Sequence, residues 1–214
     1  MPRKRRITTA HHVYHVVNRG AKKARLFEHS SDYHAFEQLL SIARTRFQMR
    51  ILAYCLMPNH WHLLLWPRGD RDLSSFGHWL GTTHATRWNR ENSTISCGAV
   101  YQSRFKSIPI ENGPHLFWAW RYVERNALRA QLVDRAEEWR WSSLWIRCNQ
   151  IDGFLDEGPI QLPDDWIETV NVPQTELELT VFRSRVATGQ PYGSQNWLTS
   201  EPPRRGRPPN LRKT

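Results

Sequence analysis

The stretch MRILAYCLMPNHWHLLLW at residues 49–66 decides the fold. Residues 49–56 have the apolar character of a strand, and residues 60–66 form a second strand that Pro67 ends. Only the short turn Met57-Pro58-Asn59 separates them. Two strands joined by so short a turn predict an antiparallel hairpin.

Working outward from this hairpin, strand and helix patterns alternate on both sides of it. A β-branched and aromatic strand precedes it, and capped segments with apolar residues at helical spacing flank it. This order predicts an α+β, ferredoxin-like split β-α-β sandwich, an antiparallel sheet with helices on one face, followed by a C-terminal extension. The expected elements are strand 12–17, helix 30–46, strands 49–56 and 60–66, helix 72–88, strand 100–108, and a helix from 113 with apolar residues as far as 128.

The charge of the chain points to a polyanionic partner. Its formal net charge is +10, which an enzyme of neutral metabolites does not need, and nucleic acid is the commonest polyanion. The charge could also serve solubility alone. The basic residues form no obvious amphipathic helix, no apolar run could span a membrane, and the three cysteines suggest neither disulfides nor a zinc site. We therefore expect no membrane partner and a cytoplasmic, nucleoid-associated location.

Two histidines on the second hairpin strand could bind a metal ion. His60 and His62 are two residues apart, so on a strand both side chains point to the same face. Paired imidazoles of this kind suit a divalent metal site. Short His-X-His triplets also arise by chance in a chain with ten histidines. The spacing alone therefore leaves a metal site and a chance triplet both open.

A second pair of candidate residues lies on the helix that begins near residue 113. Tyr122 and Asn126 are four residues apart, so they share one helix face. The Asn126 oxygen could complete a metal site, and the Tyr122 hydroxyl could attack an electrophile. Both could equally be packing residues. With His60 and His62, they suggest a metal that polarises a phosphate, a tyrosine that attacks it, and a covalent phosphotyrosine whose bond energy allows rejoining.

The chain resembles a known family at several of these segments. Met57–Leu64 resembles the His-hydrophobic-His motif of HUH single-tyrosine transposases, and the REP-associated tyrosine transposases, which are IS200-like, are the most similar group. The other matching segments are Tyr14–Gly20, Gln102–Ser107, Arg121–Asn126 and Trp139–Ser143. The motifs occur in the family's order over roughly residues 10–147.

The resemblance implies a ferredoxin-like fold and a Mg²⁺ or Mn²⁺ ion held by His60, His62 and Asn126. It also implies Tyr122 as the nucleophile and single-stranded hairpin DNA as the substrate. The family often has proline where this chain has Ala127, which restores a backbone N–H and should let the helix continue. The alternatives are a DNA-binding protein of the same fold without catalysis, and a hydrolase that uses the two histidines to activate water. Monomer and homodimer are both open.

Basic segments supply further candidates for DNA contact. We expect a basic arm at 1–9, a transposase domain at 10–147, an extension at 148–201, and a basic tail at 202–214 that resembles an AT-hook or serves as an electrostatic tether. Arg104 and Lys106 share parity on the expected strand, so both could meet DNA or both could face solvent. The expected DNA-binding residues are Arg3, Lys4, Arg5, Arg6, Arg104, Lys106, Arg204, Arg205 and Arg207.

Overall fold

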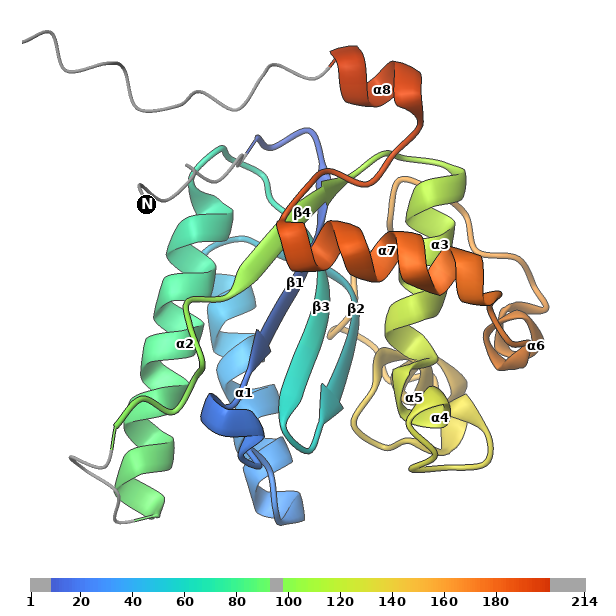
Figure 1. The fold of residues 1–214 in the computed structure, drawn as a ribbon. Coiled ribbons are helices and arrows are strands. Elements are labelled where there is room, and N and C mark those ends of the chain that lie inside the picture. The colour runs from blue at the N-terminus through green and yellow to red at the C-terminus, as the bar shows by residue number, and fades with distance from the viewer. Residues whose placement is uncertain (1–8, 93–97, 201–214) are drawn as a thin grey trace, which may run out of the picture.

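The computed structural model describes residues 9–92 and 98–200 and contains one four-stranded antiparallel sheet (Figure 1). The strand order is β2-β3-β1-β4, so the first strand lies between the third and the fourth. Helices α1 and α2 make the two connections of a split β-α-β unit. The elements are β1 (Val13–Arg19), α1 (Ser30–Arg46), β2 (Arg50–Met57), β3 (His60–Trp66), α2 (Asp72–Glu91) and β4 (Lys106–Ile110). The predicted ferredoxin-like α+β class is confirmed.

Helices cover both faces of the sheet rather than one. Helices α1 and α2 pack on one face, over a core that contains Tyr14, Tyr54 and Trp61. Helices α3 (Pro114–Glu124) and α4 (Asn126–Arg129) pack on the opposite face, with a second core. Figure 1 shows the two groups on either side of the strands. The prediction of helices on one face is therefore correct for α1 and α2. It is wrong for the whole chain, because helices after β4 cover the other face.

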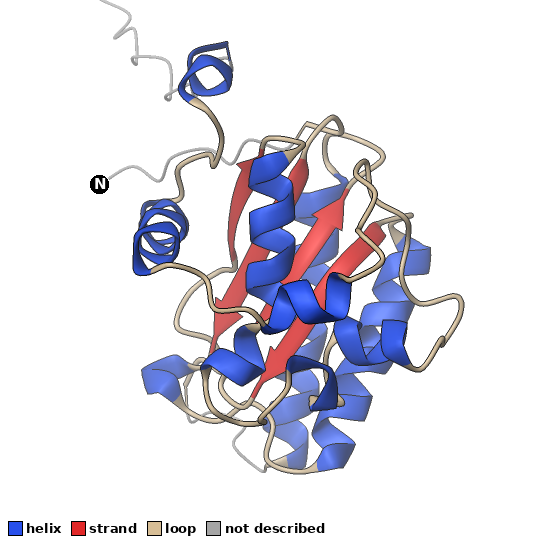
Figure 2. Ribbon diagram, turned by 90° about the vertical axis from the view of Figure 1, so that its right-hand side faces the viewer, coloured by secondary structure: helices blue, strands red, loops and turns tan. Residues whose placement is uncertain are grey.

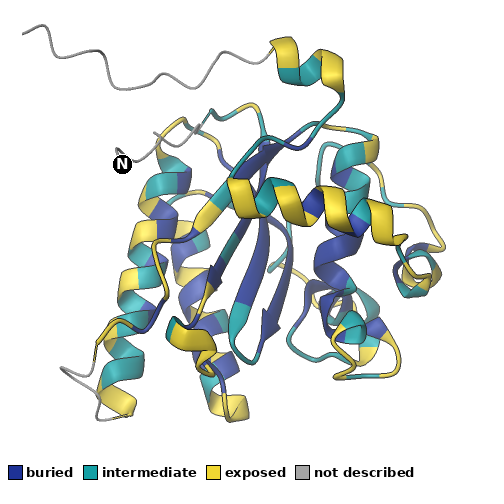
Figure 3. Ribbon diagram, in the orientation of Figure 1, coloured by how far each residue is buried: buried dark blue, intermediate teal, exposed yellow. Residues whose placement is uncertain are grey.

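The alternation of side chains along β3 decides which face carries the histidines. Trp61, Leu63 and Leu65 belong to the core under α1 and α2, while Leu64 belongs to the core under α3. Successive strand residues point to opposite faces, so His62 shares the α3 face with Leu64. The buried strands in Figure 3 show why both faces need a helical cover.

Two predicted elements differ from those observed. The strand predicted at 100–108 exists only as β4, and Tyr101 contributes just an isolated bridge to Gly20. β4 lies at the edge of the sheet, where Pro109 is tolerated because its missing N–H removes no hydrogen bond between interior strands. The helix predicted from 113 through 128 is broken at Arg125 into α3 and α4.

In the described part of the chain, four further α-helices follow α4, and all but the first lie in the C-terminal extension. They are α5 (Ser143–Cys148), α6 (Trp166–Asn171), α7 (Glu176–Thr188) and α8 (Gln195–Ser200), coloured as helices in Figure 2. Arg121 donates to the Pro173 carbonyl at 3.2 Å, and Arg125 donates to the Val170 carbonyl at 2.9 Å. These contacts fix the C-terminal end of α3 to α6 and to the segment that follows α6. Within the part of the chain that the structure describes, no helix is long and apolar enough to cross a bilayer.

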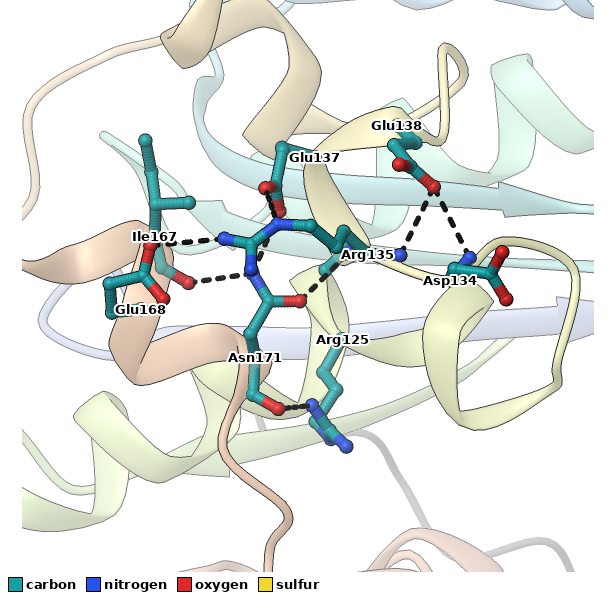
Figure 4. Close-up of polar contacts among 9 residues, drawn as sticks. Arg125, Asp134, Arg135, Glu137, Glu138, Ile167, Glu168 and Asn171 are labelled. Atoms are coloured by element: carbon teal, nitrogen blue, oxygen red, sulfur yellow. Dashed lines mark hydrogen bonds and ion pairs between the residues drawn. The ribbon is translucent and has the colours of Figure 1, made fainter.

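A polar cluster fixes α6 to the turn that follows α4 (Figure 4). Arg135 donates to a Glu168 carboxylate oxygen at 3.0 Å. The Asn171 amide accepts from the Ala136 backbone at 2.9 Å and donates to Glu137 at 2.7 Å. The middle and the C-terminal end of α6 are therefore both bonded to this turn.

Candidate active site

The histidine face of β3 opens into a cavity of about 510 Å³ between the sheet, α3, α4 and α7. The register places His62 opposite Val17 and His60 opposite Arg19, so β1 supplies the floor beside the histidines. The cavity is lined by Val17, Asn18, Arg19, Met57, His60, His62, Gln102, Ser103, Lys106, Tyr122, Asn126, Arg129, Ala130, Arg183, Val186 and Ala187. It therefore brings together the predicted chemical residues of β3, α3 and α4.

Each histidine of the pair has one ring nitrogen engaged by a neighbouring side chain. Nδ1 of His60 lies 2.6 Å from Oδ1 of Asn59, and Nδ1 of His62 lies 2.8 Å from Nε2 of His15. The His60 and His62 rings stand nearly perpendicular, with centroids 4.9 Å apart. The Nε2 atoms are thus the ring nitrogens left for a ligand in the cavity.

Burial keeps all three imidazoles neutral at ordinary pH. Burial, followed by the charge of His60, lowers the pKa of His15 to about 3. Burial, followed by the Arg19 and Arg129 guanidinium groups, lowers the pKa of His60 to about 3. Burial likewise holds the pKa of His62 well below its usual value. A neutral imidazole keeps a nitrogen lone pair, which a metal ligand requires.

Tyr122 projects from α3 toward the histidines. Its ring centroid is 5.7 Å from that of His62, and on another side its ring lies 4.6 Å from that of Phe182 on α7. The side chain is 7% exposed, and it lines the cavity. Nη2 of Arg129 lies 3.4 Å from the Tyr122 hydroxyl, and its guanidinium carbon is 4.6 Å from the ring centroid. A cation therefore stands beside the candidate nucleophile.

Asn126 shares the cavity with Tyr122, as their spacing predicted, although the helix breaks between them. Its side-chain amide lies 3.4 Å from the Tyr122 carbonyl, and its Oδ1 accepts a hydrogen bond from Arg129. An amide oxygen has two lone pairs, so Arg129 leaves one for another partner. Ala127 is compatible with the short α4, and the expectation of one continuous helix is wrong.

The donor set can accept a divalent cation of moderate hardness. His60 and His62 offer two imidazole nitrogens and Asn126 offers an oxygen, all on the wall of one cavity. Across residues 9–92 and 98–200, no group of three or more His, Cys, Asp or Glu is arranged to hold a metal. The Asn126 amide oxygen is a donor on the same wall that could complete a site with the two histidines. Mixed nitrogen and oxygen ligands of this kind fit Mn²⁺ better than they fit Mg²⁺.

The predicted basic residues divide into three groups. Lys106 lines the cavity, and its Nζ donates to the Ala187 carbonyl at 3.3 Å. Arg104 is exposed and does not line the cavity. It precedes β4, so the prediction that Arg104 and Lys106 lie on the same face of one strand is wrong. The remaining residues, Arg3, Lys4, Arg5, Arg6, Arg204, Arg205 and Arg207, lie outside the described residues.

Several cavity residues were not predicted from the sequence. Arg19, Arg129 and Arg183 add three cations to Lys106, and the described lining contains no carboxylate. Arg19 follows the β1 pattern and Arg129 lies three residues after Asn126, so helical spacing could have indicated Arg129. Arg183 comes from the extension and carries no motif. A cavity lined by four cations suits phosphate.

Comparison with known proteins identifies the family to which the chain belongs. The family model described as "Transposase IS200 like" matches residues 8–126, which include His60, His62, Tyr122 and Asn126. No curated protein sequence matches the chain.

Solved structures similar to this chain include two transposase structures. A REP-associated tyrosine transposase bound to a REP hairpin is 16% identical, with a TM-score of 0.55, covering 75% of this chain and 93% of its own. A putative transposase from Deinococcus radiodurans is 15% identical, with a TM-score of 0.40, covering 56% of this chain and 84% of its own. Because the family model spans more than half of the 214 residues, this protein belongs to the IS200-like transposases, whose members in general cut and transfer DNA.

Proposed function

We propose that this transposase cuts and rejoins single-stranded DNA through a covalent bond between Tyr122 and the DNA. The observation that carries the proposal is the position of the Tyr122 ring 5.7 Å from that of His62, in one cavity with Asn126 and four cations. His60, His62 and Asn126 would hold a Mg²⁺ or Mn²⁺ ion. That ion, when bound, would polarise the scissile phosphate as a Lewis acid.

The residues of the chain would then perform one substitution at phosphorus. The Tyr122 oxygen forms a bond to phosphorus, the bond from phosphorus to one deoxyribose oxygen breaks, and the released oxygen takes a proton to become a hydroxyl. The phenol proton leaves to solvent. Because one phosphate ester replaces another, a hydroxyl from a second DNA end can reverse the step. Arg129, which contacts both Tyr122 and Asn126, would hold the tyrosine in line.

The substrate we propose is a folded single strand of the REP hairpin type. The structurally similar REP-associated transposase is bound to a REP hairpin, and this chain covers nearly all of that protein's length. The cations of the cavity, Arg19, Lys106, Arg129 and Arg183, would contact the backbone on both sides of the cleaved bond. Basic segments outside the described residues would add salt-sensitive affinity.

The test is covalent capture of a labelled single-stranded hairpin taken from repeats that flank the gene. Protein, DNA and Mg²⁺ or Mn²⁺ are mixed and separated on a denaturing gel. We expect a metal-dependent shifted band that Tyr122→Phe abolishes while DNA binding persists. Tyr192→Phe is the matched control, because Tyr192 contacts Phe182 but does not line the cavity. Binding without a covalent band, over several hairpins and both metals, would instead support the non-catalytic DNA-binding alternative. Cleaved DNA that carries no protein would indicate a hydrolase.

We also propose that each active site forms within one chain. Tyr122 already lies beside His62 of its own chain, so a partner's tyrosine is not needed to complete the site. Mixing Tyr122→Phe with His62→Ala protein therefore should not restore the covalent band. Recovery of the band in the mixture would show that two chains exchange tyrosines.

A further inference from the structure

The turn between β2 and β3 determines which nitrogen of His60 carries a proton. Nδ2 of Asn59 lies 3.5 Å from the Lys23 carbonyl oxygen, which can only accept a hydrogen bond. This contact orients the amide nitrogen of Asn59 toward Lys23 and its Oδ1 toward Nδ1 of His60, 2.6 Å away. An amide oxygen also only accepts, so Nδ1 of His60 must be the donor. In a neutral ring this leaves the lone pair on Nε2.

The orientation of Asn59 is itself supported by the backbone. The Asn59 carbonyl accepts from the Gly20 amide at 2.9 Å, and the preceding carbonyl of Pro58 accepts from Leu26 at 2.7 Å. A Cβ on Gly20 would stand 2.3 Å from the Ala24 carbonyl oxygen, so only glycine fits this turn. The turn that follows β1 therefore fixes the tip of the hairpin that carries His60.

The second histidine depends on His15, which the chemistry described above does not use. Nε2 of His15 lies 2.8 Å from Nδ1 of His62, with the two rings stacked at a centroid distance of 5.0 Å. His15 is 1% exposed, and it lies in β1, which pairs with β3 beside the cavity. Two proton arrangements are possible in this pair. In one, His62 donates through Nδ1 and keeps a lone pair on Nε2; in the other, His15 donates and His62 carries its proton on Nε2.

Only the first arrangement leaves His62 able to bind a metal ion through Nε2. In either arrangement Nδ1 of His15 is buried without a hydrogen-bond partner in the described structure. Leaving a buried polar atom unpaired is unfavourable, and an apolar residue at this position would avoid that cost. Packing alone does not account for a buried histidine with an unpaired ring nitrogen, whereas orienting a ligand imidazole is a recognised role for such a group.

We infer that His15 and Asn59 are positioning residues, which hold His62 and His60 with Nδ1 protonated and Nε2 directed to a shared cation. This inference rests on the proposed function, because it assumes that the two histidines bind the metal. It adds that the site requires two side chains beyond its ligands, one from β1 and one from the hairpin turn. His15 and Asn59 touch neither the DNA nor the reacting atoms in this scheme.

The first test separates the acceptor role of His15 from its bulk. Mn²⁺ binding to the full chain is measured by the loss of the free-ion electron paramagnetic resonance signal. His15→Phe keeps a ring of similar size without an acceptor, whereas His15→Gln offers an amide oxygen to Nδ1 of His62. We expect about tenfold or greater loss of Mn²⁺ affinity in His15→Phe and recovery to within about threefold in His15→Gln. Thermal unfolding of both variants confirms that each is folded.

The second test reads the protons directly. Long-range ¹H–¹⁵N spectra of the metal-free protein distinguish the two neutral tautomers of each ring. We expect His60 and His62 both to carry the proton on Nδ1, Asn59→Ala to release His60 from that tautomer, and Asn59→Asp, which keeps an acceptor, to retain it. A wild-type His62 protonated on Nε2, or Mn²⁺ affinity unchanged in His15→Phe, would overturn the inference.

The two proposals fail in different ways. If the wild-type chain binds Mn²⁺ and His15→Phe weakens that binding, yet no covalent band forms, then the strand-transfer proposal fails and the positioning role stands. If the band forms but the variants bind Mn²⁺ like the wild type, then the strand-transfer proposal stands and the positioning inference fails. A wild-type chain that binds no Mn²⁺, with or without hairpin DNA, overturns the positioning inference.

Discussion

A buried carboxylate two residues beyond Tyr122 should be among the most sensitive positions in the fold. Glu124 is fully buried and accepts hydrogen bonds from Ser143 at 2.6 Å, from the Trp166 indole at 2.6 Å and from Arg147 at 3.2 Å. The Trp120 indole donates to it as well, at 3.3 Å. Through this one side chain, α3 is joined to α5 and α6.

Replacing Glu124 with glutamine removes the charge and half of the acceptor capacity while keeping the volume. The new amide nitrogen must face donors, and the Arg147 guanidinium loses its ion-pair partner. Removing one partner of a buried ion pair costs about 3–5 kcal/mol. For a chain of this size each kcal/mol lowers the melting temperature by roughly 2–4 °C. We therefore expect Glu124→Gln to melt about 6–20 °C below the wild type, by circular dichroism or calorimetry.

Glu91→Gln is the matched control, because it makes the same chemical change in an exposed pair. Arg87 and Glu91 lie four apart on α2, with side chains 37% and 43% exposed. Such a helical surface pair contributes about 0.3–0.5 kcal/mol, so the control should melt within about 2 °C of the wild type. A Glu124→Gln protein as stable as Glu91→Gln would refute the reasoning from burial.

Three further predictions follow from the described contacts. Burial, followed by the charge of Arg87, lowers the pKa of His84 to about 4. The contribution of the neutral ring to folding stability is therefore complete above the unfolded pKa of 6.5, and it is lost as the pH falls toward the folded pKa. In urea unfolding, the stability of His84→Gln should fall by about 2 kcal/mol less than that of the wild type between pH 7 and pH 5. Equal losses in the two proteins would contradict this prediction. Gly77→Ala would put a Cβ 2.3 Å from the Phe105 ring, and it should destabilise the protein by about 1–3 kcal/mol in the same assay. Arg183→Ala should weaken hairpin binding and reduce the dependence of log affinity on log salt by about one ion, whereas the same change at Arg104, outside the cavity, should leave covalent capture unaltered.

The hairpin and its histidines could be predicted from the sequence because local patterns determine them. The third strand is observed at His60–Trp66 with the predicted bounds, and the first helix, Ser30–Arg46, begins within the segment predicted as its N-cap. Strand alternation placed His60 and His62 on one face, and helical spacing brought Tyr122 and Asn126 together. These relationships depend on neighbours within a few residues, which sequence periodicity records.

The parts that could not be predicted depend on distant contacts. The alternating stretch from Val100 to Phe105 does not extend β4. It buries its apolar residues in the core beneath α2, where Phe105 packs against Gly77. The extension shows a similar limit. Leu179, Phe182 and Val186 have helical spacing, and a Thr175–Glu178 capping box starts α7, so the helix itself was predictable. Its position against Tyr122 was not, because no local pattern encodes a contact across about sixty residues.

The position of α7 also has a consequence for how the protein is made. The ribosome releases His60, His62, Tyr122 and Asn126 well before Phe182, whose ring packs on both Tyr122 and His15. A nascent chain that has emerged only as far as α4 therefore carries every proposed reactive group beside an uncovered apolar surface. Domains fold as units during synthesis, and uncovered apolar surface favours aggregation. A chain terminated after α4 should therefore give insoluble fragments rather than a smaller nuclease.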